Sequence, residues 1–283
     1  MNVASPGATA LAVVTGSSSG IGRQVAILLA RRGFRLILVA RRLDRLNRLV
    51  ADLGPAANAR AMVVDLADAN ATAAAADQLA SEATVDVLVN VAGFGVCVPF
   101  LEHAGSLDRR LMQVHYFAPA ALIRAILPGM LARRSGQIIN VASIATKVGP
   151  WGHGAYAASK SALVAMTQSL ASEHIESGVH FSYVNPGIVQ TEFFDHESFA
   201  SMAATVKRRG ISSTAAARRI VSLLDHPRLE LCIPRHYRVL DWLYALSPSW
   251  AHRLVARSSR PAGREATVAS RKSKVASRGV RQS

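Results

Sequence analysis

The stretch ALAVVTGSSSGIG, residues 10–22, decides the fold class. It begins as a short apolar run, turns through Gly16, Gly20 and Gly22, and then enters a helical pattern. Glycines permit a tight turn and a close approach of the backbone to a ligand, and the start of the following helix offers unpaired amides to an anion. A strand, a glycine-rich turn and a helix in this order predict a site for a dinucleotide. Glycines also make ordinary strand-to-helix turns, so the position after the first strand carries the inference.

The alternation of strand and helix continues to residue 234. Runs that are apolar on both faces predict strands at 10–15, 34–40, 61–66, 85–90, 136–143, 179–185 and 229–234. Helical patterns lie at 21–32, 42–53, 68–82, 106–134, 153–177 and 214–224. Strands buried on both faces are typical of a parallel sheet that is covered by helices. The pattern predicts an α/β fold with a doubly wound parallel sheet, whose ligands bind at the carboxyl ends of the strands.

The composition indicates in which cellular compartment the protein folds. Of the 283 residues 50% are hydrophobic, which is enough for a sizeable core. Cys97 and Cys232 provide neither a metal-ligand cluster nor a disulfide framework, so we expect no metal and a reducing cytoplasm. We find no secretory signal pattern at the amino terminus, and no run of about 18 apolar residues that predicts a membrane span.

Four further motifs follow the glycine turn. They are Asn90-Val91-Ala92-Gly93, Ser143, Tyr156-x-x-x-Lys160 and Asn185-Pro186-Gly187. With the turn, they resemble the shorter, single-domain branch of the short-chain dehydrogenase/reductase (SDR) family over residues 10 to about 233. The resemblance implies a Rossmann-like sheet of seven parallel strands. It also implies an enzyme that oxidises alcohols or reduces carbonyl compounds with NAD or NADP.

Tyr156 and Lys160 are four residues apart and share a helix face. A free tyrosine titrates near pH 10, so a base at neutral pH needs its pKa lowered by about 3 units, and a nearby ammonium and the positive nicotinamide ring favour this shift. The resemblance implies that Tyr156 exchanges the proton and that Lys160 also binds the nicotinamide ribose. It further implies that Ser143 binds the substrate oxygen. A Tyr and Lys pair without function, exposed on a helix, is the alternative.

The chain departs from the family pattern at His115. The family commonly has an asparagine in this helix, where it holds a water of a proton relay to the lysine. An imidazole can hydrogen-bond water and replace it. A packed or surface histidine is equally consistent with the sequence, and the protein then turns over slowly or is a binding or regulatory relative.

The second strand ends in LVARRLDR, residues 38–45, which bears on the choice of cofactor. An acidic residue here would favour NAD, but Ala40 takes that position and Arg41 and Arg42 follow. Arginines suit the 2′-phosphate, so NADP is expected over NAD, with a solvated first helical turn as the alternative.

The resemblance also implies the remaining cofactor contacts. Asp65 has helix capping as an alternative or additional role. The implied contacts are Gly16, Ser18, Gly20, Ile21, Gly22, Asp65, Leu66, Asn90, Ala92, Gly93, Tyr156, Lys160, Pro186, Gly187, Ile188 and Thr191.

Aromatic residues gather in the variable loop after residue 191. Together with residues at other strand ends they predict an apolar pocket, which favours a hydrophobic carbonyl compound or secondary alcohol as substrate. Plain packing is the alternative for any single one of them. The residues are Phe94, Val96, Val148, Trp151, Phe193, Phe194, Phe199 and Met202.

The chain after residue 233 needs a separate explanation. We expect a catalytic domain at 1–233, two short amphipathic helices within 234–257, and a basic disordered tail at 258–283. From Arg253 onward, nine Lys and Arg face only Glu265. Tryptophans beside such a stretch suit peripheral contact with the inner face of an anionic membrane. The alternative is packing over the substrate pocket or within a homo-oligomer. The tail has no aromatic residue for base stacking, so no specific nucleic-acid partner is expected.

Overall fold

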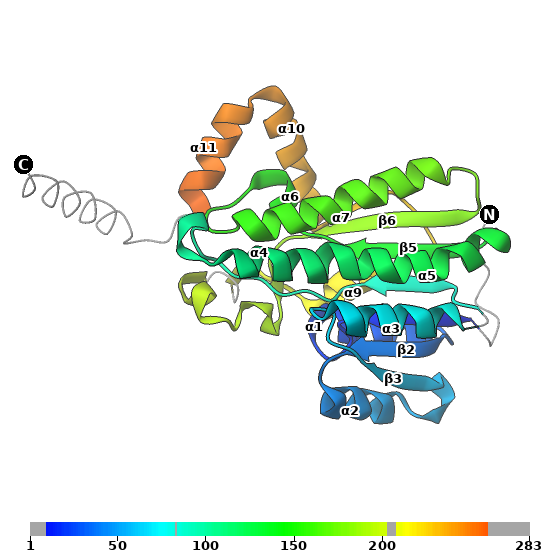
Figure 1. Cartoon of the computed structure of the whole chain (residues 1–283). Coiled ribbons are helices and arrows are strands. Elements are labelled where there is room, and N and C mark those ends of the chain that lie inside the picture. Colours follow the sequence, from blue (N-terminus) through cyan, green and yellow to red (C-terminus); the bar gives the residue numbers. More distant parts are fainter. Residues whose placement is uncertain (1–9, 83, 203–207, 260–283) are drawn as a thin grey trace, which may run out of the picture.

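A seven-stranded parallel sheet forms the centre of the protein, in the order β3-β2-β1-β4-β5-β6-β9 (Figure 1). The computed structural model describes residues 10–82, 84–202 and 208–259. The strands are β1 (Leu11–Thr15), β2 (Arg35–Ala40), β3 (Ala59–Val63), β4 (Val87–Asn90), β5 (Gly136–Val141), β6 (Val179–Pro186) and β9 (Glu230–Ile233). Two short strands, β7 (Val189–Gln190) and β8 (Ile211–Ser212), pair separately. The predicted α/β, doubly wound fold is confirmed.

Helices cover both faces of this sheet (Figure 1). They are α1 (Gly20–Arg31), α2 (Leu43–Leu53), α3 (Ala69–Ala80), α4 (Gly105–Met112), α5 (Ala118–Ala132), α6 (Ala145–Val148), α7 (Gly154–Glu173), α9 (Ser213–Val221), α10 (Val239–Leu246) and α11 (Pro248–Ser259). On one face, α1, α2 and α9 pack around Val14, and on the other, α3, α5 and α7 pack around Val13. Adjacent strand residues thus enter opposite cores, which explains why the strands are apolar on both faces.

The helix predicted at 106–134 is interrupted by a π-helical turn, Gln113–Phe117. Pro119 follows this turn and has no backbone N–H to bond the carbonyl of His115. The wider turn changes the direction in which His115 points and buries it completely. By length and composition alone, Gly105–Ala132 is able to cross a membrane. More than half of its apolar window is buried, however, as in the core helix of a globular domain.

The strand order brings the sequence motifs to one edge of the sheet. Because β1 lies between β2 and β4, the chain reverses its direction of progress at this point and leaves a crevice beyond the strand ends. The glycine turn follows β1, the segment from Asn90 to Gly93 follows β4, and Ser143 follows β5. Thr15 links the end of β1 to the segment after β4, since its Oγ1 accepts hydrogen bonds from the amides of Val91 (3.0 Å) and Ala92 (3.1 Å).

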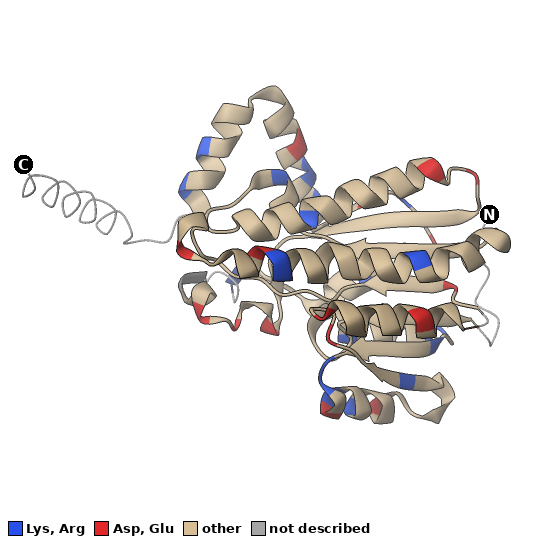
Figure 2. Cartoon of the chain, viewed as in Figure 1, with Lys and Arg blue, Asp and Glu red and all other residues tan. Residues whose placement is uncertain are grey.

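The last two described helices, α10 and α11, form a hairpin that projects from the body (Figure 1). The hydroxyl of Tyr244 donates to the carbonyl of Val148 at 3.1 Å, which ties α10 to α6. Figure 2 shows basic residues on α11 and an acidic residue on α10. The expected two helices are confirmed, although α11 extends to Ser259. The tail from residue 260 lies outside the described residues.

Candidate active site

The glycine turn forms a cradle in which the backbone is too crowded for side chains. A Cβ on Gly22 would lie 2.3 Å from the carbonyl oxygen of Gly16, and one on Gly16 would lie 2.8 Å from the Cα of Ala92. Gly16 and Gly20 also have positive φ values of 68° and 54°. Ser19 precedes α1 without a side-chain cap, and the first turn holds no acidic residue. The amides at the start of α1 are thus arranged to receive an anion.

Three side chains meet beyond β5. Tyr156 and Lys160 lie on α7 and are buried, and the hydroxyl of Ser143 lies beside that of Tyr156. The ammonium of Lys160 donates to the carbonyl oxygen of Val141 at 2.8 Å. Ser143 Oγ also accepts from the amide of Ala145 at 3.1 Å, which fixes the direction of the hydroxyl. The structure therefore brings together the serine, tyrosine and lysine expected from sequence.

Burial shifts the two titratable groups away from their ordinary values. It raises the pKa of Tyr156 to about 12, against a smaller lowering by the neighbouring Ser143 hydroxyl. It lowers the pKa of Lys160 to about 7. In the protein alone the loss of water around the phenol has the larger effect, so a lowering by the ammonium and the nicotinamide ring together stays a prediction. At pH 7 Tyr156 holds its proton, which is the state that a proton donor requires.

His115 lies beside these groups with both ring nitrogens bonded. Nε2 accepts from the amide of Phe94 at 3.2 Å, which leaves the proton on Nδ1, 2.8 Å from Ser159 Oγ. Ser159 then donates to the carbonyl of Tyr156 at 2.8 Å. Burial, and next the charge of Lys160, hold the pKa of His115 well below its usual range, so the ring is neutral. The geometry favours a packed histidine that positions α7 over one whose ring binds a relay water.

Aromatic rings lie around the ring of Tyr156. The ring of Phe193 lies 5.7 Å from that of Tyr156 and 5.6 Å from that of Phe199, centroid to centroid. His153, 6.1 Å from Tyr156, completes this wall from the loop before α7. Of the expected pocket residues, Phe199 and Val148 are buried, whereas the side chain of Met202 lies outside the described residues. The wall excludes water from the edge of the phenol that faces it.

A second polar cluster lies at the outer edge of the glycine turn. The guanidinium of Arg42 donates to the hydroxyls of Ser18 (3.1 Å) and Ser19 (2.9 Å). It also pairs at 2.9 Å with Glu192, which reaches back from the loop after β7 and bonds Arg45 as well. These two arginines lower the pKa of Glu192. Two hydroxyls and a fork of N–H donors at the end of β2 form a set that suits a phosphate group.

The comparisons with known proteins agree with this geometry. The family profile described as short chain dehydrogenase matches residues 10–200. The chain belongs to the SDR family. It is 31% identical over 269 residues to dehydrogenase/reductase SDR family member 7B of Bos taurus, a match that covers 89% of this chain and 82% of that protein. It is 37% identical over 187 residues to the Danio rerio protein of the same name, with 63% and 60% covered.

Solved SDR structures share the fold. A short-chain dehydrogenase from Sphingobium yanoikuyae in complex with NADPH superposes with a TM-score of 0.76 at 26% identity, over 85% of this chain and 95% of that one. A putative NAD(P)-dependent gluconate 5-dehydrogenase from Beutenbergia cavernae with bound NADP gives 0.75 at 31% identity, over 81% and 97%. The protein is thus an SDR oxidoreductase of the kind that uses a nicotinamide cofactor.

The residues present fit such a cofactor. Besides the glycine cradle, Gly93 lets the chain pass close to the site, since a Cβ there would lie 2.9 Å from His115 Nε2 and 3.4 Å from the ammonium of Lys160. Thr191 lies across the turn, 3.1 Å from the position of a Cβ on Gly20. The buried Oδ1 of Asn90 has no hydrogen-bond partner among the described residues. The SDR motifs therefore lie together at the carboxyl ends of neighbouring strands.

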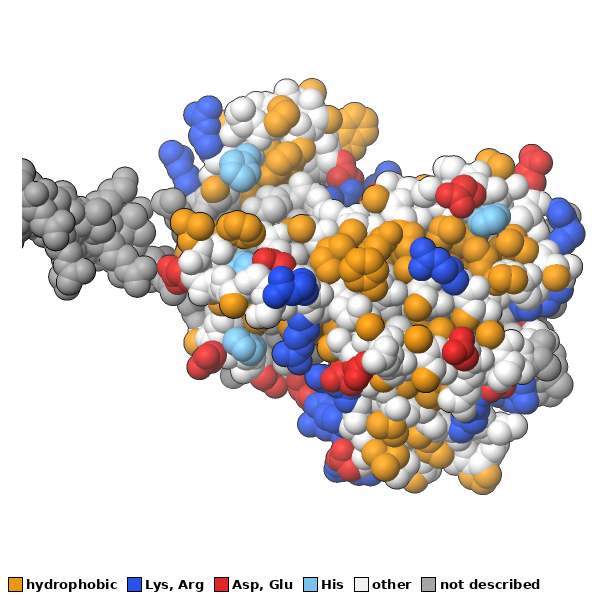
Figure 3. Space-filling view, in the orientation of Figure 1, with side chains coloured by type: hydrophobic (Ala, Val, Ile, Leu, Met, Phe, Trp, Pro, Cys, Tyr) orange, Lys and Arg blue, Asp and Glu red, His pale blue; other side chains and the backbone are white. Residues whose placement is uncertain are grey.

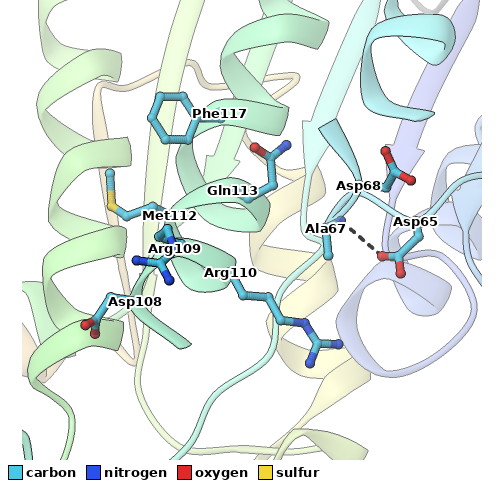
Figure 4. A pocket seen from close by; sticks show the side chains of 9 residues that line it. All are labelled: Asp65, Ala67, Asp68, Asp108, Arg109, Arg110, Met112, Gln113 and Phe117. Carbon is cyan, nitrogen blue, oxygen red and sulfur yellow. Dashed lines mark hydrogen bonds between the residues drawn. The ribbon is translucent and has the colours of Figure 1, made fainter. Parts of the chain in front are cut away.

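A separate surface groove adjoins Asp65. Figure 4 shows Asp65 and Asp68 on one side and the side chains of α4 and the π-helical turn on the other. Asp68 caps α3 and Asp65 accepts from the amide of Ala67, so the proposed capping role belongs to Asp68. Arg41 lies 4.0 Å from the Asp65 carboxylate. The groove is lined by Asp65, Ala67, Asp68, Asp108, Arg109, Arg110, Met112, Gln113 and Phe117, and the SDR serine, tyrosine and lysine are not among them.

Sequence reasoning missed three residues of the site: His153, Ser159 and Glu192. His153 and Ser159 flank Tyr156 three residues away on either side, a spacing that places Ser159 one turn along the helix. No local pattern predicts that Glu192 reaches Arg42, because 150 residues separate them in the chain.

Proposed function

We propose that the protein transfers hydride between NADP(H) and a hydrophobic carbonyl compound or secondary alcohol, with Tyr156 as the acid and base. The observation that carries this is the buried Tyr156, with the Ser143 hydroxyl beside it and an aromatic wall around its ring, one helical turn from a buried lysine. A hydroxyl pair in this position binds a single oxygen atom from two sides.

In the reductive direction the chain's own groups act on the carbonyl oxygen. Ser143 and Tyr156 donate hydrogen bonds to it, and these strengthen as negative charge develops. NADPH, when bound, supplies the hydride to the carbonyl carbon. Tyr156 then gives its proton to the oxygen, and its pKa of about 12 keeps that proton in place until then. Lys160 stabilises the resulting phenolate when protonated, and Val141 fixes its ammonium.

His115 supports this arrangement as a positioning residue. Its ring accepts a hydrogen bond from the amide of Phe94 and donates one to Ser159, whose hydroxyl donates to the backbone carbonyl of Tyr156. The three contacts fix the first turns of α7 relative to the π-helical turn. Because both ring nitrogens are engaged, a proton relay does not pass through this imidazole without breaking one of them.

The preference for NADP rests on the Arg42 cluster. Arg42 with Ser18 and Ser19 would hold a 2′-phosphate, and Arg41 with Asp65 would lie beside the adenosine. The glycine cradle and α1 would receive the pyrophosphate, and Ile188 and Thr191 the nicotinamide amide. In support, the two solved relatives described above contain NADPH and NADP.

Loss of NADPH absorbance with a panel of hydrophobic ketones and aldehydes tests this function. We expect turnover with at least one aromatic or long-chain carbonyl compound and weaker turnover with short polar ones, because Phe193 and Phe199 wall the pocket. NADH should give lower catalytic efficiency. Binding of NADPH without turnover across the whole panel would instead indicate a binding or regulatory protein.

A further inference from the structure

One face of the α10–α11 hairpin is fastened to the body. Asp241 and Glu230 both pair with Lys147 of α6. At the far end of α11, the amide of Trp151 donates to Ser259 Oγ at 3.1 Å. Ala251 is buried between these attachments. The hairpin therefore has a defined orientation relative to the pocket, because it is held at both ends and in the middle.

The opposite face of the hairpin presents large apolar side chains to solvent. On α10 these are Val239, Trp242 and Leu246, spaced three and four residues apart on one stripe, with Trp242 70% and Leu246 81% exposed. On α11 they are Trp250, 54% exposed, and Leu254, four residues later. Exposed single apolar residues are ordinary, but five on 16 residues of one projection are a patch.

Cations border this apolar face. Arg235, Arg238, Arg253 and Arg257 are exposed, and the one acidic residue of the hairpin, Asp241, already pairs with Lys147. Figure 3 shows basic and hydrophobic side chains side by side on the visible face of the projection. The sequence from residue 260 onward adds seven Lys and Arg against Glu265. The described residues around the patch are thus positive, and the sequence that follows α11 is basic.

We propose that the hairpin docks the protein on a membrane surface that contains anionic lipid. Tryptophan has an apolar ring and a polar N–H, which suits the boundary between acyl chains and headgroups. The bordering arginines face the negative headgroups. Helices of 8 and 12 residues are too short to span a bilayer, so the hairpin lies in the interface plane.

A second copy of the chain matches this face less well. Two copies related by a two-fold axis would bring the same face of each together, and with it the same ring of arginines. Like charges would then be buried against one another without a carboxylate to pair them, whereas an anionic bilayer complements them.

Docking would also bring the pocket close to the lipid. The hairpin holds Lys147, Val148 and Trp151, all of which lie between Ser143 and Tyr156 in the chain. A hydrophobic carbonyl compound dissolved in the bilayer would reach the site without crossing water. This consequence rests on the proposed function, whereas docking itself does not.

Co-sedimentation of the full chain with vesicles tests the proposal without measuring activity. We expect the protein to pellet with vesicles of phosphatidylcholine and phosphatidylglycerol, to pellet far less with phosphatidylcholine alone, and to dissociate as salt is added. The double variant Trp242→Ala/Trp250→Ala should lower the partition coefficient by about tenfold or more. The matched control, Phe117→Ala/Ile175→Ala, removes two exposed apolar side chains elsewhere and should leave it within about twofold.

Each remaining outcome overturns the proposal. A wild-type protein that stays in the supernatant with anionic vesicles does not dock. A double variant that pellets as well as the wild type binds through the basic tail alone. If the wild type is a dimer that does not bind vesicles, and the double variant is a monomer, then a second copy covers the face. Circular dichroism of all variants establishes that each is folded.

Discussion

The catalytic pocket and the Arg42 cluster lie at the same edge of the sheet but differ in what controls their charged groups. In the pocket, Tyr156 and Lys160 are buried, and the loss of water sets their pKa values. In the cluster, Arg42 and Glu192 remain about half exposed and are held by direct ion pairing. Interactions between buried charges involve large free energies, whereas those between exposed charges involve small ones. Substitutions in the pocket should therefore alter chemistry and stability strongly, and those in the cluster should adjust cofactor preference.

The largest effect in this comparison should come from the buried charge of Lys160. Its pKa is 10.5 ordinarily and about 7 in the folded protein. Between these values the unfolded chain binds a proton that the native state lacks, so wild-type stability rises with pH through this window. Below pH 7 the native state bears the full cost of the charge. Lys160→Met should thus raise the free energy of unfolding by about 3 kcal/mol more at pH 6 than at pH 9.

Urea unfolding of both proteins at the two pH values measures this difference. Taking the difference between pH values cancels the constant cost of leaving the carbonyl of Val141 without its donor. An effect of Lys160→Met that is the same at pH 6 and pH 9 would show that the ammonium is well solvated, and the contrast between the two regions would fail.

Arg42→Ala should give the next largest effect. Hydrogen bonds to charged groups contribute about 1.5 to 3 kcal/mol, so catalytic efficiency with NADPH should fall by roughly 30-fold. Efficiency with NADH should change much less, because NADH lacks the 2′-phosphate that Arg42 would bind. Arg48→Ala is a suitable control, since Arg48 pairs with Asp44 on the same helix. Equal losses with both cofactors would remove Arg42 from the choice between them.

His115→Ala should lower turnover by about tenfold through misplacement of α7. The Michaelis constant for NADPH should change less than turnover, because the ring does not contact the Arg42 cluster. Ser159→Ala breaks the same chain of hydrogen bonds and should reproduce the loss. A loss in His115→Ala that Ser159→Ala does not share would favour the relay through the imidazole, and unchanged activity in both would remove the chain from the mechanism.

The smallest effect should come from Glu192→Gln in the cluster. The carboxylate of Glu192 bonds the same guanidinium that would hold the 2′-phosphate. Removing its charge should raise affinity for NADPH about threefold and leave affinity for NADH alone, a size typical of exposed pairs. Fluorescence titration with each cofactor measures this. Weaker NADPH binding in the variant would mean that Glu192 orients Arg42 and does not compete for it.

The pocket's residues were predictable from sequence, whereas their electrostatics were not. The motif Tyr156-x-x-x-Lys160 fixes a shared helix face, and the end of β5 fixes Ser143, because both follow from local spacing. The direction of the tyrosine's pKa depends on how much water the tertiary fold removes, which spacing does not encode. For this reason the expected lowering stays a prediction for the complex with the cofactor.

The cluster shows the reverse. The chemistry of Arg41 and Arg42 indicated a phosphate site directly, but their partners come from distant loops. Glu192 follows β7, and Ser18 precedes α1, so only the completed fold brings them to Arg42. The π-helical turn at His115 was also hidden, since a continuous apolar period over 106–134 predicts an unbroken helix. Pro119 was its one local signal.

Turnover of Tyr156→Phe on a carbonyl substrate found in the panel tests the central claim most directly. The phenylalanine ring keeps the packing against Phe193 and removes only the transferable proton. We predict that turnover falls by about a thousandfold, while fluorescence titration shows NADPH binding and circular dichroism shows the fold unchanged. Wild-type turnover in this variant would contradict the role of Tyr156 as the proton donor.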